Sequence, residues 1–418
     1  MRKILLATTA VAAAALFGPA EAAAQEAPTV RVGGYFRFNY AFTDQDGSSL
    51  NGNNTGKNDF ASDAEVHVIV SGKAANGISY GATIEIQEDQ NRQSTATTAT
   101  KTSLDIDEQY VWVASPTFGQ LRVGDEDGPV TGAFLTGIVT NFGTGGIDGD
   151  GYDNIIGANQ RPSYYAGGAL ADSSKVIYSS PDFFGFDFGA SFAFNNGEGE
   201  DSGCEAVSSL CDRLGSSPGG ILRQRNERQA AIRYRGSFGG VGLQAMAGYI
   251  GSDVVNNSTV TGPLSGQISG KQMSAYTVGA QLAAYGFLVG GNYIWGDYNG
   301  GIAPMARRGS GVGAGTIVDD REASQITVGA SYTIQALTVG ANAYYVRNAG
   351  SQTVGAERKD RAWSVGANYT LAPGLQLVAE YLNIQRKENG FDFLAGSAGA
   401  ANNKVGTDVF LTGVRIAF

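Results

Sequence analysis

The chain has 418 residues and a formal net charge of −10 at pH 7, with 61 glycines, 10 prolines and a single histidine. It contains no block of lysine and arginine, which excludes a nucleic-acid-binding surface. Downstream of the N-terminal region no run of about 18 apolar residues occurs, so a transmembrane helix is excluded as well. Glycine is about twice its average usage of ~7%, and this glycine- and aromatic-rich chain predicts one large all-β structure.

The N-terminal residues have the order of a secretory signal peptide. Arg2-Lys3 is followed by an apolar run over 4–17 and by the small residues Ala22-Ala23-Ala24. This order predicts a signal peptide over 1–24 and a single mature domain over 25–418. A membrane anchor helix is the alternative, but the apolar run is shorter than the ~20 residues that a spanning helix needs.

Sixteen runs of alternating apolar and polar residues follow along the mature chain. Most are close to the ~10 residues that a tilted strand needs to cross a bilayer core. We expect strands at 29–43, 63–74, 77–88, 105–115, 118–125, 174–180, 184–195, 226–237, 240–251, 270–284, 286–297, 321–334, 336–348, 359–371, 374–386 and 405–418.

The connections between these runs alternate between short and long. Phe238-Gly239 and Ala372-Pro373 are examples of the short ones, and the longest loop covers about 126–173. An antiparallel barrel with an even number of strands produces this alternation, because all its tight turns lie at one end. Outer-membrane barrels have short periplasmic turns and long outer loops. The sequence therefore predicts a 16-stranded antiparallel transmembrane β-barrel.

The predicted strands are apolar on one face, as a lipid-facing wall requires. In the first strand Phe36 and Phe38 share one face, while Arg37 and Asn39 share the other. Aromatic residues that could form interfacial girdles lie near strand ends: Tyr249, Tyr293, Trp295, Tyr345, Trp363, Tyr369 and Tyr381. A soluble β-sandwich is the alternative, but the strand lengths and the two-sided loop asymmetry favour the barrel.

Lipid cannot satisfy unpaired backbone groups, so an open sheet edge cannot face hydrocarbon. We therefore expect the first strand, 29–43, to pair with the last, 405–418, and to close the barrel. The last strand ends at Phe418 and carries Phe410, Val414 and Ile416 on the same face.

Two motifs and the terminal strand resemble the general porins of Gram-negative bacteria, especially those of alphaproteobacteria. The motifs are Phe118-Gly119-Gln120-Leu121-Arg122-Val123-Gly124 and the segment over 181–190, which reads PDFFGFDFGA. The resemblance covers essentially the whole mature chain. One departure is that the usual acidic motif of enterobacterial members is not recognisable inside the long loop.

The resemblance implies a homotrimer in the outer membrane of a Gram-negative bacterium, with lipid bilayer and lipopolysaccharide around it. It also implies that the third long loop, about 126–173, folds into the barrel and narrows the pore. Phe418 stands where the family has the aromatic signal for the outer-membrane assembly machinery.

Charged residues of the long loop and of nearby strands are the candidates for the pore constriction. The acidic side consists of Asp125, Glu126, Asp127, Asp148, Asp150 and Asp153, and the basic side of Arg31, Arg37, Arg122 and Arg415. Acids facing bases would set a transverse field, and rings of charge set ion preference. The alternative is that these are solvated loop charges and incidental lumen charges.

The sequence offers two weaker local signals. Asp148, Asp150 and Asp153 resemble part of a calcium loop, because alternating carboxylates can converge on a hard cation, but a closing Glu is missing. A flexible acidic loop is the favoured reading, and no resident cofactor is expected. Cys204 and Cys211 lie in one loop of an exported chain, so a local disulfide is expected.

The sequence lacks the motifs of the common enzyme classes, so we do not expect an enzyme. His67 is the only histidine, it lies in a predicted strand beside Glu65, and no G-x-S-x-G elbow surrounds any serine. No phosphate or dinucleotide fingerprint and no zinc-protease motif occurs. The repeats Val278-Gly279-Ala280 and Val328-Gly329-Ala330 are expected to keep the lumen open rather than to bind a cofactor.

The sequence therefore predicts passive diffusion of ions and small hydrophilic solutes through a water-filled pore, with a mild cation preference. A channel specific for a sugar or an anion is one rival, although the only local basic cluster is Arg223, Arg225, Arg228, Arg233 and Arg235. A plugged barrel with a structural or adhesive role is the other.

Overall fold

The computed structural model describes residues 26–47, 56–88, 104–155, 157, 160–162, 173–195, 222–256, 270–300, 305–306, 321–351 and 354–418. The expected signal peptide and both Cys204 and Cys211 lie outside the described residues, so the cleavage site and the disulfide stay predictions. Within the described ranges, no helix is long and apolar enough to cross a membrane.

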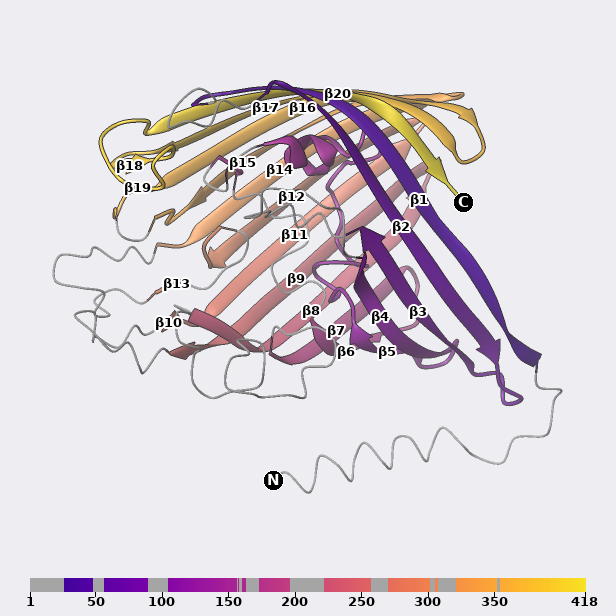
Figure 1. The fold of residues 1–418 in the computed structure, drawn as a ribbon. Helices are drawn as coiled ribbons and strands as arrows, with labels where there is room; N and C mark the ends of the chain where they lie inside the picture. The colour runs from indigo at the N-terminus through magenta and orange to yellow at the C-terminus, as the bar shows by residue number, and fades with distance from the viewer. Residues whose placement is uncertain are drawn as a thin grey trace.

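A closed barrel of antiparallel strands makes up the fold, and each strand pairs with its neighbours in chain order (Figure 1). Its sixteen strands are β1 (Glu26–Gln45), β2 (Asn58–Lys73), β3 (Ser79–Glu88), β4 (Leu104–Ser115), β5 (Gly119–Asp125), β6 (Ser174–Ser179), β7 (Phe186–Asn195), β8 (Leu222–Phe238), β9 (Val241–Asn256), β11 (Met273–Ala284), β12 (Phe287–Asp297), β14 (Ala323–Ile334), β15 (Leu337–Asn348), β16 (Arg358–Ala372), β17 (Leu375–Glu388) and β20 (Lys404–Ala417). Two-residue pairs lie in the long loops: β10 (Gly270–Lys271) with β13 (Met305–Ala306), and β18 (Phe391–Asp392) with β19 (Ser397–Ala398). The predicted fold class is confirmed.

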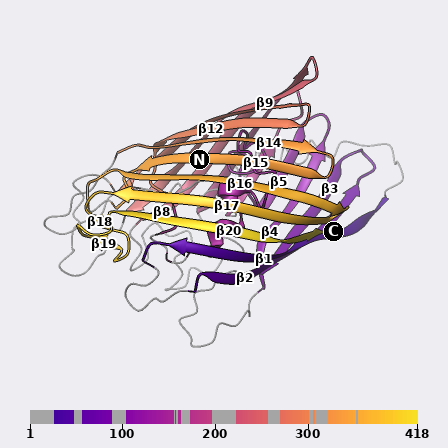
Figure 2. The same cartoon turned by 90° about the horizontal axis from the view of Figure 1, so that it is seen from above.

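The first and last strands close the barrel, as predicted. β1 pairs with β20 in antiparallel register, with Arg37 opposite Arg415, and the two strands lie side by side in Figure 2. The pairing reaches the last residue, because Gly34 and Phe418 exchange both backbone hydrogen bonds at 3.1 Å. No strand of the barrel wall is left with an unpaired edge.

The short connections have backbone conformations suited to tight hairpins. Gly239 and Gly240 have φ angles of 58° and 86°, and Tyr285 and Gly286 have 53° and 86°. Positive φ at both central residues is typical of the type I′ turn, whose twist matches that of paired strands. These turns all lie at one end of the barrel, which the family of outer-membrane barrels places in the periplasm.

The outward face of β16 follows the polarity profile of a bilayer. From the loop end it presents Lys359, Arg361, Trp363, Val365 and Tyr369, all of them exposed. Charged groups suit the headgroup level, aromatic rings suit the interface, and aliphatic side chains suit the hydrocarbon. Similar girdle rings pack together on the neighbouring strands, such as Trp363 with Tyr381, whose ring centroids are 5.4 Å apart.

Candidate functional site

The loop that follows β5 folds into the barrel and follows its inner wall, as the magenta segment in Figure 1 shows. We call residues 126–172 the inner loop; 126–155, 157 and 160–162 of it are described. It contains two short 3₁₀ helices, η1 (Gly146–Asp148) and η2 (Asp150–Asn154). Its hydrogen bonds run in order from Gln229 on β8, through Asn292 on β12, to Arg37 on β1. The described part of the inner loop therefore covers the wall from β8 to β17 and reaches β1.

Glycines on the barrel wall make room for the inner loop. A Cβ at Gly290 would lie 2.6 Å from the carbonyl oxygen of Gly137, and one at Gly329 would lie 2.9 Å from the Cβ of Val139. At Gly279 a side chain would overlap the Thr136 carbonyl. The glycine repeats were expected to keep the lumen open. That expectation is wrong, because the inner loop fills the space beside these glycines and the missing side chains make room for it.

Buried polar side chains of the wall satisfy the loop backbone. Asn342 on β15 donates to the carbonyl oxygens of Val139 at 2.9 Å and Gly145 at 3.2 Å, and accepts from the Ile147 N–H at 3.1 Å. Glu380 on β17 accepts from the N–H groups of Thr144 and Gly146, each at 2.9 Å. Sequence reasoning missed both residues.

Apolar side chains of the inner loop also pack onto the wall. Val130 and Phe134 join a buried cluster with Met246 and Ile250 of β9, among others. Ile147 and Ile155 join a second cluster that includes Leu382 of β17. Hydrogen bonds to its backbone and the burial of its apolar side chains therefore hold the described part of the inner loop against the wall.

Asp150 is the loop acid that reaches the barrel wall at β1. Its carboxylate accepts hydrogen bonds from Arg37 at 2.6 Å and from Asn39 at 2.7 Å. The Arg37 guanidinium also pairs with Asp63 of β2. Burial raises the pKa of the Asp150 carboxyl, although the charge of Arg37 opposes that rise. Asp148 and Asp153 have exposed side chains, but their surroundings still raise the pKa of both carboxyls through partial loss of solvent, that of Asp148 to about 7.

The three acids at the base of the inner loop are held by local partners. Asp125 accepts from Gln109 at 2.9 Å, and Glu126 pairs with Arg122 at 2.6 Å. Burial raises the pKa of both Glu126 and Asp127, and Arg122 opposes the rise at Glu126.

The basic candidates lie at different places on the wall. Arg37 and Arg122 each pair with a loop carboxylate, as above, and Arg415 is exposed beside Tyr35, with its guanidinium carbon 5.4 Å from that ring's centroid. Arg31 is also exposed, but it lies six residues from Arg37 along β1, which is about 20 Å at ~3.3 Å per residue. The structure thus brings Arg37 and Arg415 together and leaves Arg31 nearer the turn end.

The wall opposite the inner loop also carries acids that sequence reasoning did not include. Asp63 and Glu65 are on β2, Glu85 is on β3, and all three are half-buried on the lumen side. Tyr35 donates to Glu65 at 3.1 Å and to Asp63 at 3.3 Å. Their alternation along β2, opposite an apolar outward face, was the signal in the sequence that could have found them. Acids therefore lie on both sides of the opening.

The calcium candidates are not gathered at one point. Asp150 is engaged by Arg37 and Asn39, while Asp148 and Asp153 face the lumen. The one group of three potential metal ligands within the described ranges consists of other residues. Calcium binding, the less favoured alternative in the sequence, gains no support from this geometry.

Comparison with known proteins identifies the barrel. A family model described as Gram-negative porin matches residues 7–389. The chain belongs to the Gram-negative porin family. A channel of this family conducts by passive diffusion across the bacterial outer membrane, which is the function and the location of this porin.

Solved porin structures share the fold of this porin at low sequence identity. A mutant of the Rhodobacter blastica porin is 16% identical with a TM-score of 0.51, and the alignment covers 93% of this chain and 100% of that one. An anion-selective porin from Comamonas acidovorans is 14% identical with a TM-score of 0.58, covering 94% and 100%. A loop-deletion mutant of OmpT from Vibrio cholerae is 15% identical with a TM-score of 0.53, covering 94% and 100%. No curated protein sequence matches the chain.

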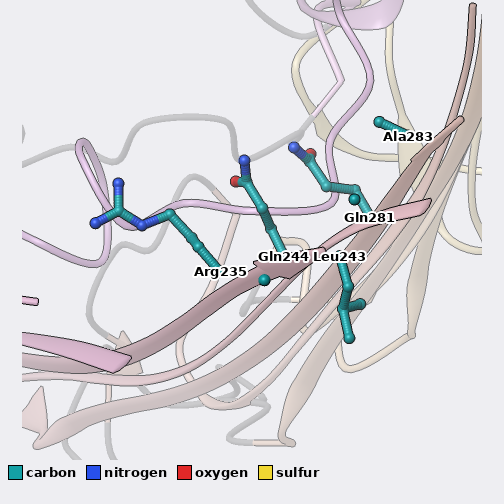
Figure 3. A pocket seen from close by; sticks show the side chains of 7 residues that line it. Arg235, Leu243, Gln244, Gln281 and Ala283 are labelled. Carbon is teal, nitrogen blue, oxygen red and sulfur yellow. The ribbon is translucent and has the colours of Figure 1, made fainter. Parts of the chain in front are cut away.

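The turn end of the porin has a polar inner wall. A hollow of about 120 Å³ lies beside β8, β9 and β11, where Arg235, Gln244 and Gln281 point to one side and Leu243 points to the other (Figure 3). Arg235 and Arg233 both pair with Asp187, at 2.9 and 2.7 Å.

The arginines of β8 do not form one basic site. Arg228 is bound to Asp253 at 2.8 Å, toward the loop end of the strand. It lies five residues from Arg233, which is about 16 Å at ~3.3 Å per residue. The arginines with described side chains are therefore spread along β8, and Arg228 and Arg233 each have a carboxylate partner of their own.

Proposed function

We propose that this porin passes small hydrophilic solutes and ions with a preference for cations. The observation that carries the proposal is the excess of carboxylates around the opening between the inner loop and strands β1–β5. The wall contributes Asp63, Glu65 and Glu85, and the loop contributes the exposed Asp148 and Asp153.

The basic residues at the opening are largely compensated. Arg37 is held between Asp63 and Asp150, and Arg122 is held by Glu126. Arg415, and Arg161 of the inner loop, are the exposed cations there among the described residues, and the charge of Arg161 acts on Asp153. An acid-lined passage with low-dielectric walls raises the local concentration of cations, which favours cation flux.

The Comamonas structure is described as anion-selective, so the shared fold does not decide the sign of the preference. The test is the reversal potential of single channels in a planar bilayer under a salt gradient. We expect a cation-selective potential, which Asp148→Asn combined with Asp153→Asn lowers. An anion-selective potential for the unaltered channel would refute the proposal.

A channel specific for one solute is the remaining alternative for transport. Liposome swelling with sugars of graded size separates the two, because a general pore discriminates by size and a specific one discriminates between solutes of equal size. We also propose that the porin has no enzymatic activity and needs no resident cofactor, since passive diffusion draws only on the solute gradient.

We propose a homotrimer that associates through the outer face of β2–β5. Apart from rings at the strand ends, this face presents aliphatic side chains: Val66, Ile84, Ile106, Val111, Val113, Leu121 and Val123. Girdle aromatics belong where lipid meets water, so their scarcity here supports a protein neighbour. Chemical cross-linking in native membranes tests this, and Val111→Lys is expected to lower the trimer yield.

We propose that the outer ends of β15–β17 and β20 bind lipopolysaccharide phosphates. A hollow of about 340 Å³ there is lined by Lys359, Arg361, Lys387 and Lys404, among others. It lies above the girdle ring Trp363 on the outward face, at the level of headgroups. Replacing the three lysines by glutamine should reduce the lipopolysaccharide that copurifies, and an unchanged amount would contradict the assignment.

The role of Phe418 as an assembly signal is also part of this proposal. The side chain is 64% exposed at the end of β20, where a partner can reach it. Deleting the phenyl ring with Phe418→Ala should lower the amount of folded porin in the outer membrane while leaving refolding in detergent unchanged.

A further inference from the structure

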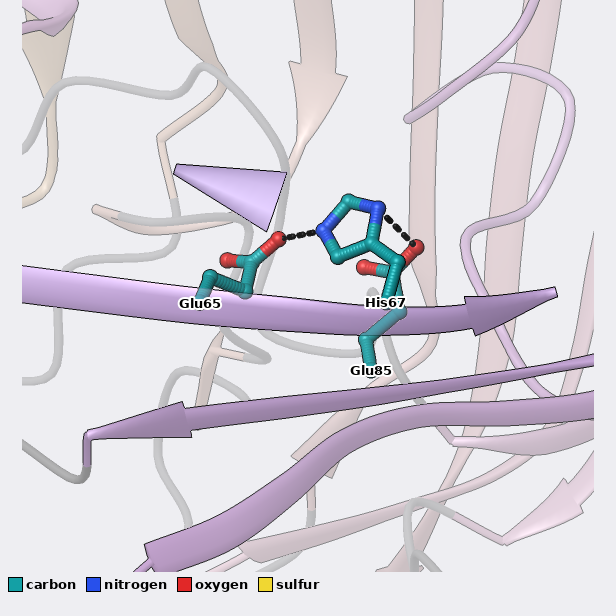
Figure 4. Close-up of side chains that lie close together, drawn as sticks. All are labelled: Glu65, His67 and Glu85. Atoms are coloured by element: carbon teal, nitrogen blue, oxygen red, sulfur yellow. Dashed lines mark hydrogen bonds and ion pairs between the residues drawn. The ribbon is translucent and has the colours of Figure 1, made fainter. Parts of the chain in front are cut away.

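Three potential metal ligands meet on the lumen side of β2 and β3. Glu65 and His67 are two residues apart on β2 and so share one face, and Glu85 lies directly opposite His67 on β3. Figure 4 shows the imidazole between the two carboxylates. His67 is the only histidine of the chain.

The donor atoms of these three side chains are already close. One atom from each lies within 4.8 Å of the other two, and among the described residues this is the one such group. The Nδ1 atom of His67 is 3.6 Å from a Glu85 oxygen, and its Nε2 atom contacts Glu65. The two carboxylates lie at opposite nitrogens of the ring, so one of the two flexible glutamate side chains rotates around the imidazole when both bind one ion.

The group is built on a rigid scaffold and is open to the lumen. Directly opposed residues of paired strands have Cβ atoms about 4.5–5.5 Å apart, a separation that hydrogen bonding across the ladder maintains. The side chains of Glu65, His67 and Glu85 are 12%, 28% and 17% exposed, so an ion and its water ligands can reach them. Tyr35 donates to the second oxygen of Glu65 at 3.1 Å, which orients that carboxylate from outside the group.

The surroundings favour a cation. Glu85 is also near Asp107 of β4, and Asp63 lies two residues before Glu65 on the same face. Arg37 is the nearby base, and its guanidinium is taken up by Asp63, Asp150 and the Tyr35 hydroxyl. Negative charge therefore exceeds positive charge around the three ligands.

We propose that Glu65, His67 and Glu85 form a binding site for a borderline divalent transition metal, such as Zn²⁺, on the pore wall. One imidazole and two carboxylates suit Zn²⁺ or Ni²⁺, whereas Mg²⁺ and Ca²⁺ prefer oxygen ligands alone. Water completes the coordination. The ring nitrogen that binds the ion is deprotonated, and any proton it carried is released to solvent.

A bound ion would alter the channel, a consequence that rests on the proposed cation preference. Two positive charges on the acidic wall oppose the entry of other cations, so cation current falls while the metal is present. The competing reading is that His67 is an imidazolium shared by two carboxylates, with no affinity for metals beyond that of any acidic surface.

The test is calorimetric titration of purified, folded porin with Zn²⁺, repeated with Mg²⁺, together with bilayer conductance. We expect one Zn²⁺ per subunit, no comparable binding of Mg²⁺, and a loss of affinity of about tenfold or more in His67→Gln. Asp148→Asn with Asp153→Asn is the matched control, since it removes lumen carboxylates but leaves the three ligands. Equal Zn²⁺ affinity in the unaltered porin and His67→Gln would overturn the proposal.

A second variant and a spectroscopic probe guard against misfolding. Glu85→Gln keeps the size of the side chain and should also weaken binding. Co²⁺ bound to the unaltered porin should give visible absorption bands of a nitrogen- and oxygen-ligated ion, and these bands should be absent in both variants. The folding of both variants is checked separately by their heat-modifiable migration on gels. Anion selectivity with intact Zn²⁺ binding would refute only the proposed ion preference, whereas cation selectivity without binding would refute only the metal site.

Discussion

One half of the barrel's inner wall is covered by the inner loop, and the other half faces the open passage. From β8 to β17 the wall lies against the inner loop, and its lumen face carries glycines, amides and buried carboxylates such as Gly290, Asn342 and Glu380. From β1 to β5 the wall faces the opening, and it carries charged groups such as Glu65 and Arg122. Inward-pointing strand positions therefore contact the polypeptide of the inner loop on one half of the barrel and water on the other half.

The difference follows from what each neighbour can satisfy. A polypeptide backbone presents donors and acceptors at fixed places and needs hydrogen-bonding partners at matching positions, so an amide, a buried carboxylate such as Glu380 or a missing side chain fits it. Water can solvate an ion from any direction, so charges can remain on the open half. Conductance should therefore depend on the covered half through the position of the loop and on the open half through charge.

The largest effect is expected from removing the anchor that holds three loop groups. Asn342→Leu leaves the carbonyls of Val139 and Gly145 and the N–H of Ile147 without their wall partner. Each unsatisfied buried group costs about 1–3 kcal/mol, so the loop should leave the wall and move toward the opening. Single-channel recordings should show a lower mean conductance and much greater open-channel noise.

Asn368 provides the control for that substitution. It lies on the inward face of the neighbouring strand β16, but it has no hydrogen bond to the described part of the inner loop, and its Oδ1 has no partner among the described residues. Asn368→Leu should leave both conductance and noise near those of the unaltered porin. A quiet Asn342→Leu channel of normal conductance would show that the loop does not depend on this anchor.

The sequence was sufficient to predict the wall of the barrel, because alternation along a strand is a local property. The ends of β8 and β9 were the weaker part, since they were predicted at 226–237 and 240–251 but extend over Leu222–Phe238 and Val241–Asn256. Beyond the bilayer both faces of a strand meet water, so the apolar alternation that reveals a strand disappears there.

The seating of the inner loop could not be read from the sequence. A glycine such as Gly290 and an amide such as Asn342 look like ordinary lumen residues until the loop is placed against them. Their partners, Gly137 and Val139, are about 150 and 200 positions away in the chain. The acids and bases of the constriction were found as candidates, but their pairing depends on where that loop comes to rest.

Alanine substitutions at two adjacent glycines of β12 should have different effects, both smaller than that of Asn342→Leu. Gly290 faces the inner loop, where an added Cβ would lie 2.6 Å from the Gly137 carbonyl oxygen, whereas at Gly291 the nearest atom would be 3.5 Å away. Gly290→Ala should lower the free energy of unfolding by about 1–3 kcal/mol, because the added methyl group overpacks the contact with the loop. It should also reduce conductance, because the loop shifts into the opening. Gly291→Ala should change neither, and equal behaviour of the two variants in calorimetry and recordings would contradict the seating of the loop.

The smallest effect should be a change of ion preference with pH, which concerns the open half. Burial raises the pKa of Glu126 and Asp150 above the ordinary values of 4.5 and 3.8, against the opposing charges of Arg122 and Arg37. A raised carboxyl pKa means that the group takes up its proton, and loses its negative charge, at a higher pH than usual. As the pH is lowered, cation preference, measured as the reversal potential, should therefore begin to fall at a higher pH than that at which solvated carboxylates take up protons. Glu126→Gln with Asp150→Asn should reduce that early part of the fall without abolishing it, because burial also raises the pKa of Asp153 and raises that of Asp148 to about 7. A reversal potential that declines along one ordinary carboxylate curve in both channels would show that the paired acids do not contribute to selectivity.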